Sequence, residues 1–180
     1  MRYDKFTIKS QDALNDAQGL ADKKGQQEIT PLHLAYALVN QPDGIVRPIL
    51  AKAGVQPPMV LEALDKQIEK LPKISGTGLT SYVGPDLKTA LDIALAESEK
   101  MRDEFVSTEH LLVGLATPPR HGSSPVADLL RRYGATPDAL REAFTEALDY
   151  ETQTLRMLTA YREMFLRQAQ WHDTGSPDAY

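Results

Sequence analysis

The side chains best suited to chemistry stand in a row at Thr108, Glu109 and His110, which offer a nucleophile, an acid and a base. Consecutive residues of a helix point in different directions, so their reactive atoms cannot meet at one substrate atom. His33 and His110 occupy equivalent positions of a sequence repeat, which suits a structural role near a helix start. The sequence therefore predicts no catalytic site.

Metal, cofactor and nucleotide chemistry find no support either. The chain has no Cys, and His121 and His172 stand alone in polar stretches, whereas a metal site needs clustered ligands. The pattern G-x-x-x-x-G-K-[ST], which cradles nucleotide phosphates, is absent. We expect a protein that is not an enzyme and needs no cofactor.

Composition narrows the class further. The 180 residues are 42% hydrophobic and 25% charged, which is typical of a globular protein of one domain, with or without a tail. The net charge of -5 argues against a nucleic-acid partner. The first ten residues lack a signal-peptide core, and no apolar run approaches bilayer length. We expect a cytoplasmic protein without a membrane partner.

The elements that carry these side chains come from a duplication. The segment beginning at Ala13 matches the segment beginning at Ala90 without a gap, so that Ile29 answers to Val106 and His33 to His110. After a longer loop in the second copy, Val46, Ile49, Leu50 and Gly54 answer to Val126, Leu129, Leu130 and Gly134. A duplicated helical unit usually supports binding, because each copy needs the other to bury its apolar face.

Helical spacing and capping signals run through both copies. Thr7, Thr30 and Ser107 are predicted N-caps, and Gly54 and Gly134 are predicted to close short helices. No segment alternates clearly enough to predict a strand. We expect an all-α domain over residues 1–148. Its two pseudo-symmetric four-helix repeats occupy residues 1–71 and 86–148, with a Gly-, Ser-, Thr- and Pro-rich connector at 72–85.

Residues 149–180 are predicted to add a C-terminal helix and a tail. Leu155, Leu158 and Phe165 fall at helical spacing with charges between them, which predicts an amphipathic helix from about Glu151 to Gln170 and a frayed tail beyond it. Such a helix packs back on the domain, pairs with a second copy or docks on a partner. The sequence leaves these three alternatives open.

Several blocks resemble the N-terminal domain of Clp AAA+ chaperones, and most of all the ClpB disaggregase branch. They are the paired Gly54 and Gly134 and the segments Asp4-Lys5-Phe6-Thr7, Ile29-Thr30-Pro31-Leu32-His33-Leu34 and Phe105-Val106-Ser107-Thr108-Glu109-His110-Leu111. The resemblance implies two pseudo-twofold repeats that engage unfolded or aggregated polypeptide, or adaptors, ahead of an ATP-driven ring. The chain itself is expected to be a stand-alone protein, with a fragment of a longer chaperone as the alternative.

The resemblance also implies a polypeptide-binding surface. The matching positions are Thr7, Asp103 and Glu109, the apolar Leu91 and Ile93, and His110 in place of a common leucine. An apolar groove would take a client side chain, and carboxylates on its rim would orient amides or attract basic residues.

Each of these residues also has a structural interpretation. Thr7 fits an N-cap, and Asp103 fits a helix terminator. Glu109 fits a carboxylate that interacts with a helix dipole, an effect of about 0.3–1 kcal/mol. Leu91 fits the core, because its counterpart Leu14 shares the predicted buried stripe.

One departure bears on the ligand. In the ClpC branch both repeats carry Thr-Glu-His, and the two glutamates bind phosphorylated arginine. Here the first repeat has Leu32, which accepts no hydrogen bond, so a symmetric pair of phosphoarginine sites is not expected. A single site at Glu109 stays open. Without client binding, the alternative function is a structural protein that assembles through its C-terminal helix.

Overall fold

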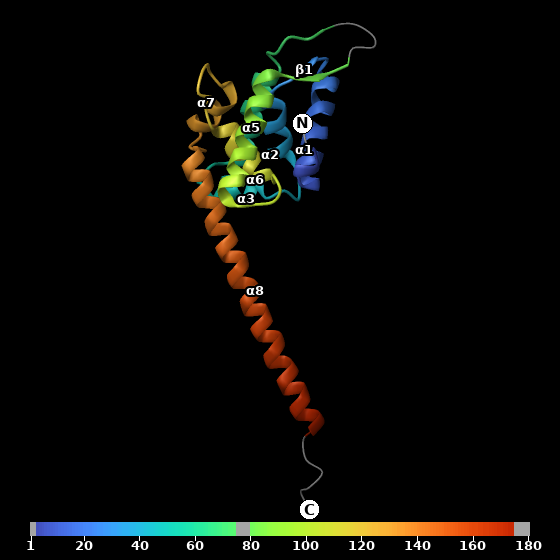
Figure 1. The fold of residues 1–180 in the computed structure, drawn as a ribbon, viewed down its shortest axis with the longest axis vertical. Helices are drawn as coiled ribbons and strands as arrows, with labels where there is room; N and C mark the ends of the chain where they lie inside the picture. Colours follow the sequence, from blue (N-terminus) through green and yellow to red (C-terminus); the bar gives the residue numbers. More distant parts are fainter. Residues whose placement is uncertain (1–2, 75–79, 175–180) are drawn as a thin grey trace, which may run out of the picture. The chain divides into compact units, whose positions relative to one another are not determined.

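The computed structural model describes residues 3–74 and 80–174, and over these residues the chain is almost entirely helical (Figure 1). Part of the predicted connector, residues 75–79, and the end of the predicted tail, residues 175–180, lie outside the described residues. A short 3-10 helix η1 (Tyr3–Lys5) comes first. The helices of the first repeat follow: α1 (Ile8–Lys24), α2 (Pro31–Asn40), α3 (Val46–Lys52) and α4 (Pro57–Ile68). Those of the second are α5 (Pro85–Met101), α6 (Thr108–Ala116), α7 (Pro125–Arg132) and α8 (Pro137–Thr174). The all-α fold is confirmed.

Local signals explain where α1 begins and ends. The Thr7 hydroxyl accepts a hydrogen bond from the amide of Ser10 at 3.3 Å, which satisfies one amide of the first turn. Gly25 ends the helix with a φ of 70°, a left-handed conformation that glycine adopts without strain. Between these caps, Ala13, Leu14, Ala17 and Ala21 are buried at helical spacing. Thr7 therefore fills the capping role that its position predicts.

Two short parallel strand contacts correct the expectation that the chain has no strand. Strand β1 (Glu28–Ile29) pairs with β2 (Tyr82–Val83), so that Ile29 lies opposite Val83. An isolated bridge joins Phe6 to Val106. Two-residue strands are too short to show alternation, so the sequence pattern could not reveal them.

These two contacts are counterparts in the duplication. A shift of 77 positions takes Ala13 to Ala90, and the same shift takes Phe6 to Val83 and Ile29 to Val106. In each contact, a residue shortly before the first helix of one repeat pairs with a residue shortly before the second helix of the other repeat. These pairs are Phe6 with Val106 and Val83 with Ile29. The repeats are interlocked through their backbones at two equivalent places.

The core forms where the central helices of the two repeats meet. Helix α1 packs on α2 and α5 packs on α6, while α2 contacts α4, α6 and α7. The largest fully buried side chains come from both repeats: Leu34, Leu38, Ile49, Leu50, Leu64, Ile68, Leu87, Leu91, Leu111, Leu112, Leu115 and Leu130. One continuous core is what two half-sized helical repeats need to bury their apolar faces.

Helix α8 is longer than the sequence suggests. It runs unbroken from Pro137 to Thr174, whereas the sequence predicts a repeat helix to about residue 148 and a second helix from Glu151. The chain divides into two compact units, Met1–Phe144 and a second beginning at Thr145. In the second unit, every side chain from residue 148 to 167 is exposed. We call Met1–Phe144 the repeat unit.

Candidate functional site

The two buried histidines close the starts of equivalent helices. The ring Nδ1 of His33 accepts a hydrogen bond from the amide of Thr30 at 3.0 Å, and Nδ1 of His110 accepts one from the amide of Ser107 at 3.0 Å. Each histidine thus replaces the Glu or Gln of an ordinary capping box. His110 is 1% exposed and His33 is fully buried, which gives both a structural role.

The far side of each ring meets equivalent partners. Nε2 of His33 lies 2.7 Å from the amide oxygen of Gln26, and Nε2 of His110 lies 3.0 Å from a carboxylate oxygen of Asp103, the counterpart of Gln26. Burial, with a smaller effect of the Lys24 charge, lowers the pKa of His33 to about 4. Asp103, about half of whose side chain is exposed, therefore lies beside the buried ring of His110 and also meets solvent.

The exposed and partly exposed residues of the predicted site lie close in the chain to the Phe6–Val106 contact. The amide of Thr7 donates to the carbonyl of Val106 at 3.1 Å, and the amide of Val106 donates to the carbonyl of Lys5 at 2.7 Å. The chain neighbours of this contact are exposed apolar side chains, Ile8 at 78% and Phe105 at 45%. We call Thr7, Ile8, Asp103, Phe105 and Glu109 the bridge surface.

The bridge surface combines apolar side chains with carboxylates. Glu109 lies in the first turn of α6, partly exposed, with one carboxylate oxygen 3.4 Å from the Thr108 hydroxyl. Ile8 occupies the first position of α1, out of phase with the buried stripe, and so has nothing to pack against within that helix. Sequence reasoning missed Ile8 and Phe105. The signal for Ile8 is an apolar residue that follows a predicted cap but falls off the buried face.

Two of the predicted binding residues, Leu91 and His110, are buried inside the repeat unit. Leu91 is 2% exposed within the core, because it continues the buried stripe of α5, and His110 is buried as a cap. Neither reaches a ligand without a rearrangement of the core. The structure thus places both side chains inside the repeat unit and not at its surface.

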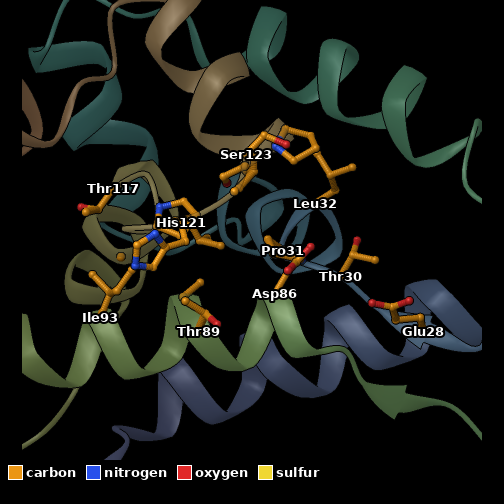
Figure 2. Close-up of a pocket in the computed structure, with 18 of the residues that line it drawn as sticks. Glu28, Thr30, Pro31, Leu32, Asp86, Thr89, Ile93, Thr117, His121 and Ser123 are labelled. Atoms are coloured by element: carbon orange, nitrogen blue, oxygen red, sulfur yellow. The ribbon is translucent and has the colours of Figure 1, made fainter.

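Ile93 lies at a different place, a cavity of about 490 Å³ in the repeat unit (Figure 2). Asp86, Thr89 and Ile93 reach into it from one side of α5, opposite Pro31 and Leu32 at the start of α2. The loop between α6 and α7 closes it with Thr117, His121 and Ser123.

The cavity and Glu109 occupy counterpart places in the duplication. Leu32, which lines the cavity, is the counterpart of Glu109 by the shift of 77 positions. Glu28 and Asp86 supply negative charge among the lining residues, and Leu32, Ile93, Leu115 and Val126 supply apolar surface. The cavity suits a side chain with an apolar stem, with or without a positive end.

No group of three or more His, Asp or Glu side chains among the described residues is placed to hold a metal ion. No helix in the described ranges is both long enough and apolar enough to cross a membrane.

Comparison with known proteins identifies the family of the repeat unit. Residues 5–122 match the family model of the Clp repeat (R) N-terminal domain. The chaperone protein ClpB of Mycobacterium bovis is 41% identical over 140 residues, which are 78% of this chain and 16% of that relative. The chain thus spans about a sixth of the length of the curated relatives it matches.

Solved structures share the fold. The N-terminal domain of Hsp104 from Candida albicans superposes with a TM-score of 0.62 at 17% identity, covering 77% of this chain and 87% of that domain. A complex of a ClpV N-domain with a VipB peptide gives a TM-score of 0.61 at 20% identity, covering 78% of this chain and 85% of that one. At these identities the likeness establishes the fold.

Proposed function

This chain belongs to the Clp repeat N-terminal domain family, and on that premise we propose that it is a non-catalytic module that binds polypeptide for a Clp-type ATPase. Its clients are unfolded or aggregated chains, or segments of adaptors. The similarity to ClpB chaperones supports this proposal, and so does a related N-domain solved with a bound peptide. The partner motor would be a separate chain or a continuation of this one.

The observation that carries the proposal is the exposure of Ile8 and Phe105 on either side of the Phe6–Val106 contact. Large apolar side chains held by a hydrogen-bonded backbone form a preformed place for an apolar client residue. Glu109 and Asp103 add carboxylates that can accept hydrogen bonds from client amides or attract basic side chains. Unfolded chains offer all of these groups.

We expect this binding to be weak and tolerant of sequence. Two exposed apolar anchors bury far less area than a specific protein interface, which commonly covers about 800 Å² on each partner. A module that samples many unfolded segments gains from a small apolar contact with a polar rim, because few client side chains are then rejected.

Fluorescence anisotropy with a permanently unfolded model polypeptide tests the proposal. We expect saturable binding that weakens at least about fivefold in Ile8→Ser and Phe105→Ser, and less in Glu109→Gln, because apolar contact dominates. Circular dichroism verifies that each variant is folded.

Two control variants locate the effect. Tyr82→Ser removes an aromatic residue, 51% exposed, that belongs to β2 in the equivalent β1–β2 contact, and it should leave binding unchanged. Thr89→Trp fills the mouth of the cavity from an exposed position of α5. If Thr89→Trp abolishes binding while Ile8→Ser does not, the cavity and not the bridge surface takes the client.

A further inference from the structure

The exposed part of α8 carries an apolar stripe that nothing in the chain's described residues covers. Leu148, Leu155, Leu158 and Phe165 are 45%, 64%, 61% and 72% exposed. With Glu151 and Arg162 they follow the alternating three- and four-residue spacing of a coiled-coil seam on one side of the helix. A solvent-facing stripe of this kind marks an interaction surface.

Two charged residues, Glu151 and Arg162, occupy core positions of the stripe. Written as heptads, the first core position holds Leu148, Leu155 and Arg162, and the fourth holds Glu151, Leu158 and Phe165. Glu151 and Arg162 are exposed, and the described residues give neither an ion pair. A charge within a seam is costly unless the partner supplies its opposite.

A second copy of this helix places an opposite charge against Glu151 and against Arg162 in one arrangement only. In an antiparallel pair, first core positions face fourth core positions. Centring the pair between residues 156 and 157 places Glu151 opposite Arg162, Leu155 opposite Leu158 and Leu148 opposite Phe165. Every layer is then matched, and the two ends of the seam are identical, as a twofold axis requires.

Other arrangements leave mismatched layers. A parallel pair in register sets Glu151 against Glu151 and Arg162 against Arg162. Sliding the antiparallel pair by one heptad in one direction sets Arg162 against Leu158, and in the other direction sets Glu151 against Leu155. Like charges or an unpaired charge in a seam disfavour all three.

We propose that two copies of this chain associate through an antiparallel coiled coil of α8, from Leu148 to Phe165, with Glu151 and Arg162 of the two copies forming its two ion-pair layers. The neighbouring stripe of Tyr150, Met157, Tyr161 and Met164 is uncharged and sets no direction. The seam spans about 27 Å, so we expect a weak association, with a dissociation constant in the micromolar range.

The consequence for binding follows if the proposed function holds. A pair of chains would present two bridge surfaces to one unfolded polypeptide. Two linked sites hold a client more tightly than one, without any new contact.

Sedimentation equilibrium on the full chain without client tests the association itself. At about 100 µM we expect twice the mass of one chain. Glu151→Arg or Arg162→Glu alone places like charges in both ion-pair layers and should raise the dissociation constant at least about tenfold. The double variant Glu151→Arg/Arg162→Glu restores opposite charges only in the antiparallel arrangement, and it should regain the twofold mass.

Controls on the polar side of the same helix complete the test. Glu163→Arg and Arg156→Glu make the same charge changes away from the seam and should leave the mass unchanged. A chain that stays monomeric at this concentration would overturn the proposal and favour packing of α8 within one chain. Single variants that keep the twofold mass, or a double variant that does not regain it, would overturn it as well.

Discussion

At the scale of single residues, the duplication explains identities that would otherwise look functional. His33 and His110 cap equivalent helices, and their partners Gln26 and Asp103 are themselves equivalent. Even the backbone repeats, because the amides of Gln26 and Asp103 both donate at 2.9 Å to equivalent carbonyls, those of Ala21 and Ser98. The sequence Glu109-His110 thus resembles a catalytic pair, but in the fold His110 caps the start of α6.

His33 gives this cap a pH signature. Its pKa in the folded protein is about 4, below the ordinary value of 6.5, so the unfolded chain binds more protons between these values. Folding stability is therefore complete above about pH 6.5 and falls as the pH drops toward 4, by on the order of 3 kcal/mol from this group. Urea unfolding at a series of pH values measures the loss.

His33→Gln is the matched variant, because glutamine also completes a capping box but does not titrate. We expect the wild-type protein to lose more stability than this variant between pH 6.5 and 4. Parallel curves for the two proteins would mean that His33 is protonated in the folded state.

The bridge surface shows how far the sequence indicates which residues reach solvent. Thr7, Asp103 and Glu109 were identified from the family pattern; Asp103 is exposed, and Thr7 and Glu109 are partly exposed. Leu91 and His110 were assigned to the surface from the same pattern, although the spacing of Leu91 already placed it on the buried stripe. Phe105 gave no signal, since only the pairing of Phe6 with Val106 turns its side chain outward.

At the scale of elements, the repeats differ most where α5 crosses α6. A Cβ atom on Gly114 would come within 2.7 Å of the carbonyl oxygen of Ala90 and 2.9 Å of the Cβ of Ala94. The counterpart of Gly114 in the first repeat is Ala37, so α1 and α2 leave room for one more carbon. Only the second helix pair needs glycine for this close approach.

Gly114→Ala should therefore destabilise the repeat unit by about 1–3 kcal/mol, because backbone atoms must move apart to admit the methyl group. Gly19→Ala is the control, since Gly19 lies within α1 with no atom near its Cβ position. It should stabilise the protein by about 0.5–1 kcal/mol through helix propensity. Chemical denaturation that gave the two variants the same sign would contradict the close packing.

A buried ion pair is the second difference between the repeats. Glu97, only 4% exposed, accepts hydrogen bonds from Arg141 at 2.6 and 3.1 Å and so ties α5 to the first turns of α8. The first repeat has Leu20 and Leu61 at the equivalent positions. The hydrogen bonds from Arg141 lower the pKa of Glu97, more strongly than burial raises it.

Glu97→Leu alone should cost about 2 kcal/mol or more, because Arg141 loses its two hydrogen bonds to the buried carboxylate and keeps only exposed partners such as Asp138. The double variant Glu97→Leu/Arg141→Leu copies the first repeat and should recover most of that loss. The difference in stability between the wild-type protein and Glu97→Leu should shrink at acid pH. The wild-type ion pair stabilises the fold fully above the unfolded pKa of Glu97, about 4.5, and this stabilisation is lost as the pH falls through the lowered pKa of the folded state. Urea unfolding measures the stability of Glu97→Leu, Arg141→Leu and the double variant. If the loss in the double variant equals the sum of the losses in the two single variants, the two residues are not coupled.

At the scale of the whole molecule, the helices were predictable from sequence and their joining was not. Caps such as Thr7 and Ser107, and buried stripes such as that of α5, rest on local chemistry that spacing reveals. The β1–β2 pair and the Phe6–Val106 bridge join residues more than 50 positions apart, and only the folded core brings them together. The continuity of α8 was also missed, because nothing local marks residues 149–150 as either an end or a link.

The Phe6–Val106 contact between the repeats is structural, and in our proposal it also positions the client-binding residues. The same backbone hydrogen bonds that interlock the repeats hold Ile8 and Phe105 in solvent. At the equivalent β1–β2 contact Tyr82 and Val83 are exposed, and Glu28 of β1 and Asp86 of α5 line the cavity with negative charge. The duplication has thus produced two related surfaces, of which we assign client binding to the first.

Site-specific photo-crosslinking tests this assignment most directly. A photoreactive phenylalanine analogue is placed at one position at a time, at 8, 105, 82 or 59, all of which carry exposed apolar side chains. With an unfolded model polypeptide, we predict strong adducts from positions 8 and 105 and background levels from 82 and 59. Equal adducts from all four positions, or strong adducts from 82 alone, would contradict the bridge surface as the client-binding site.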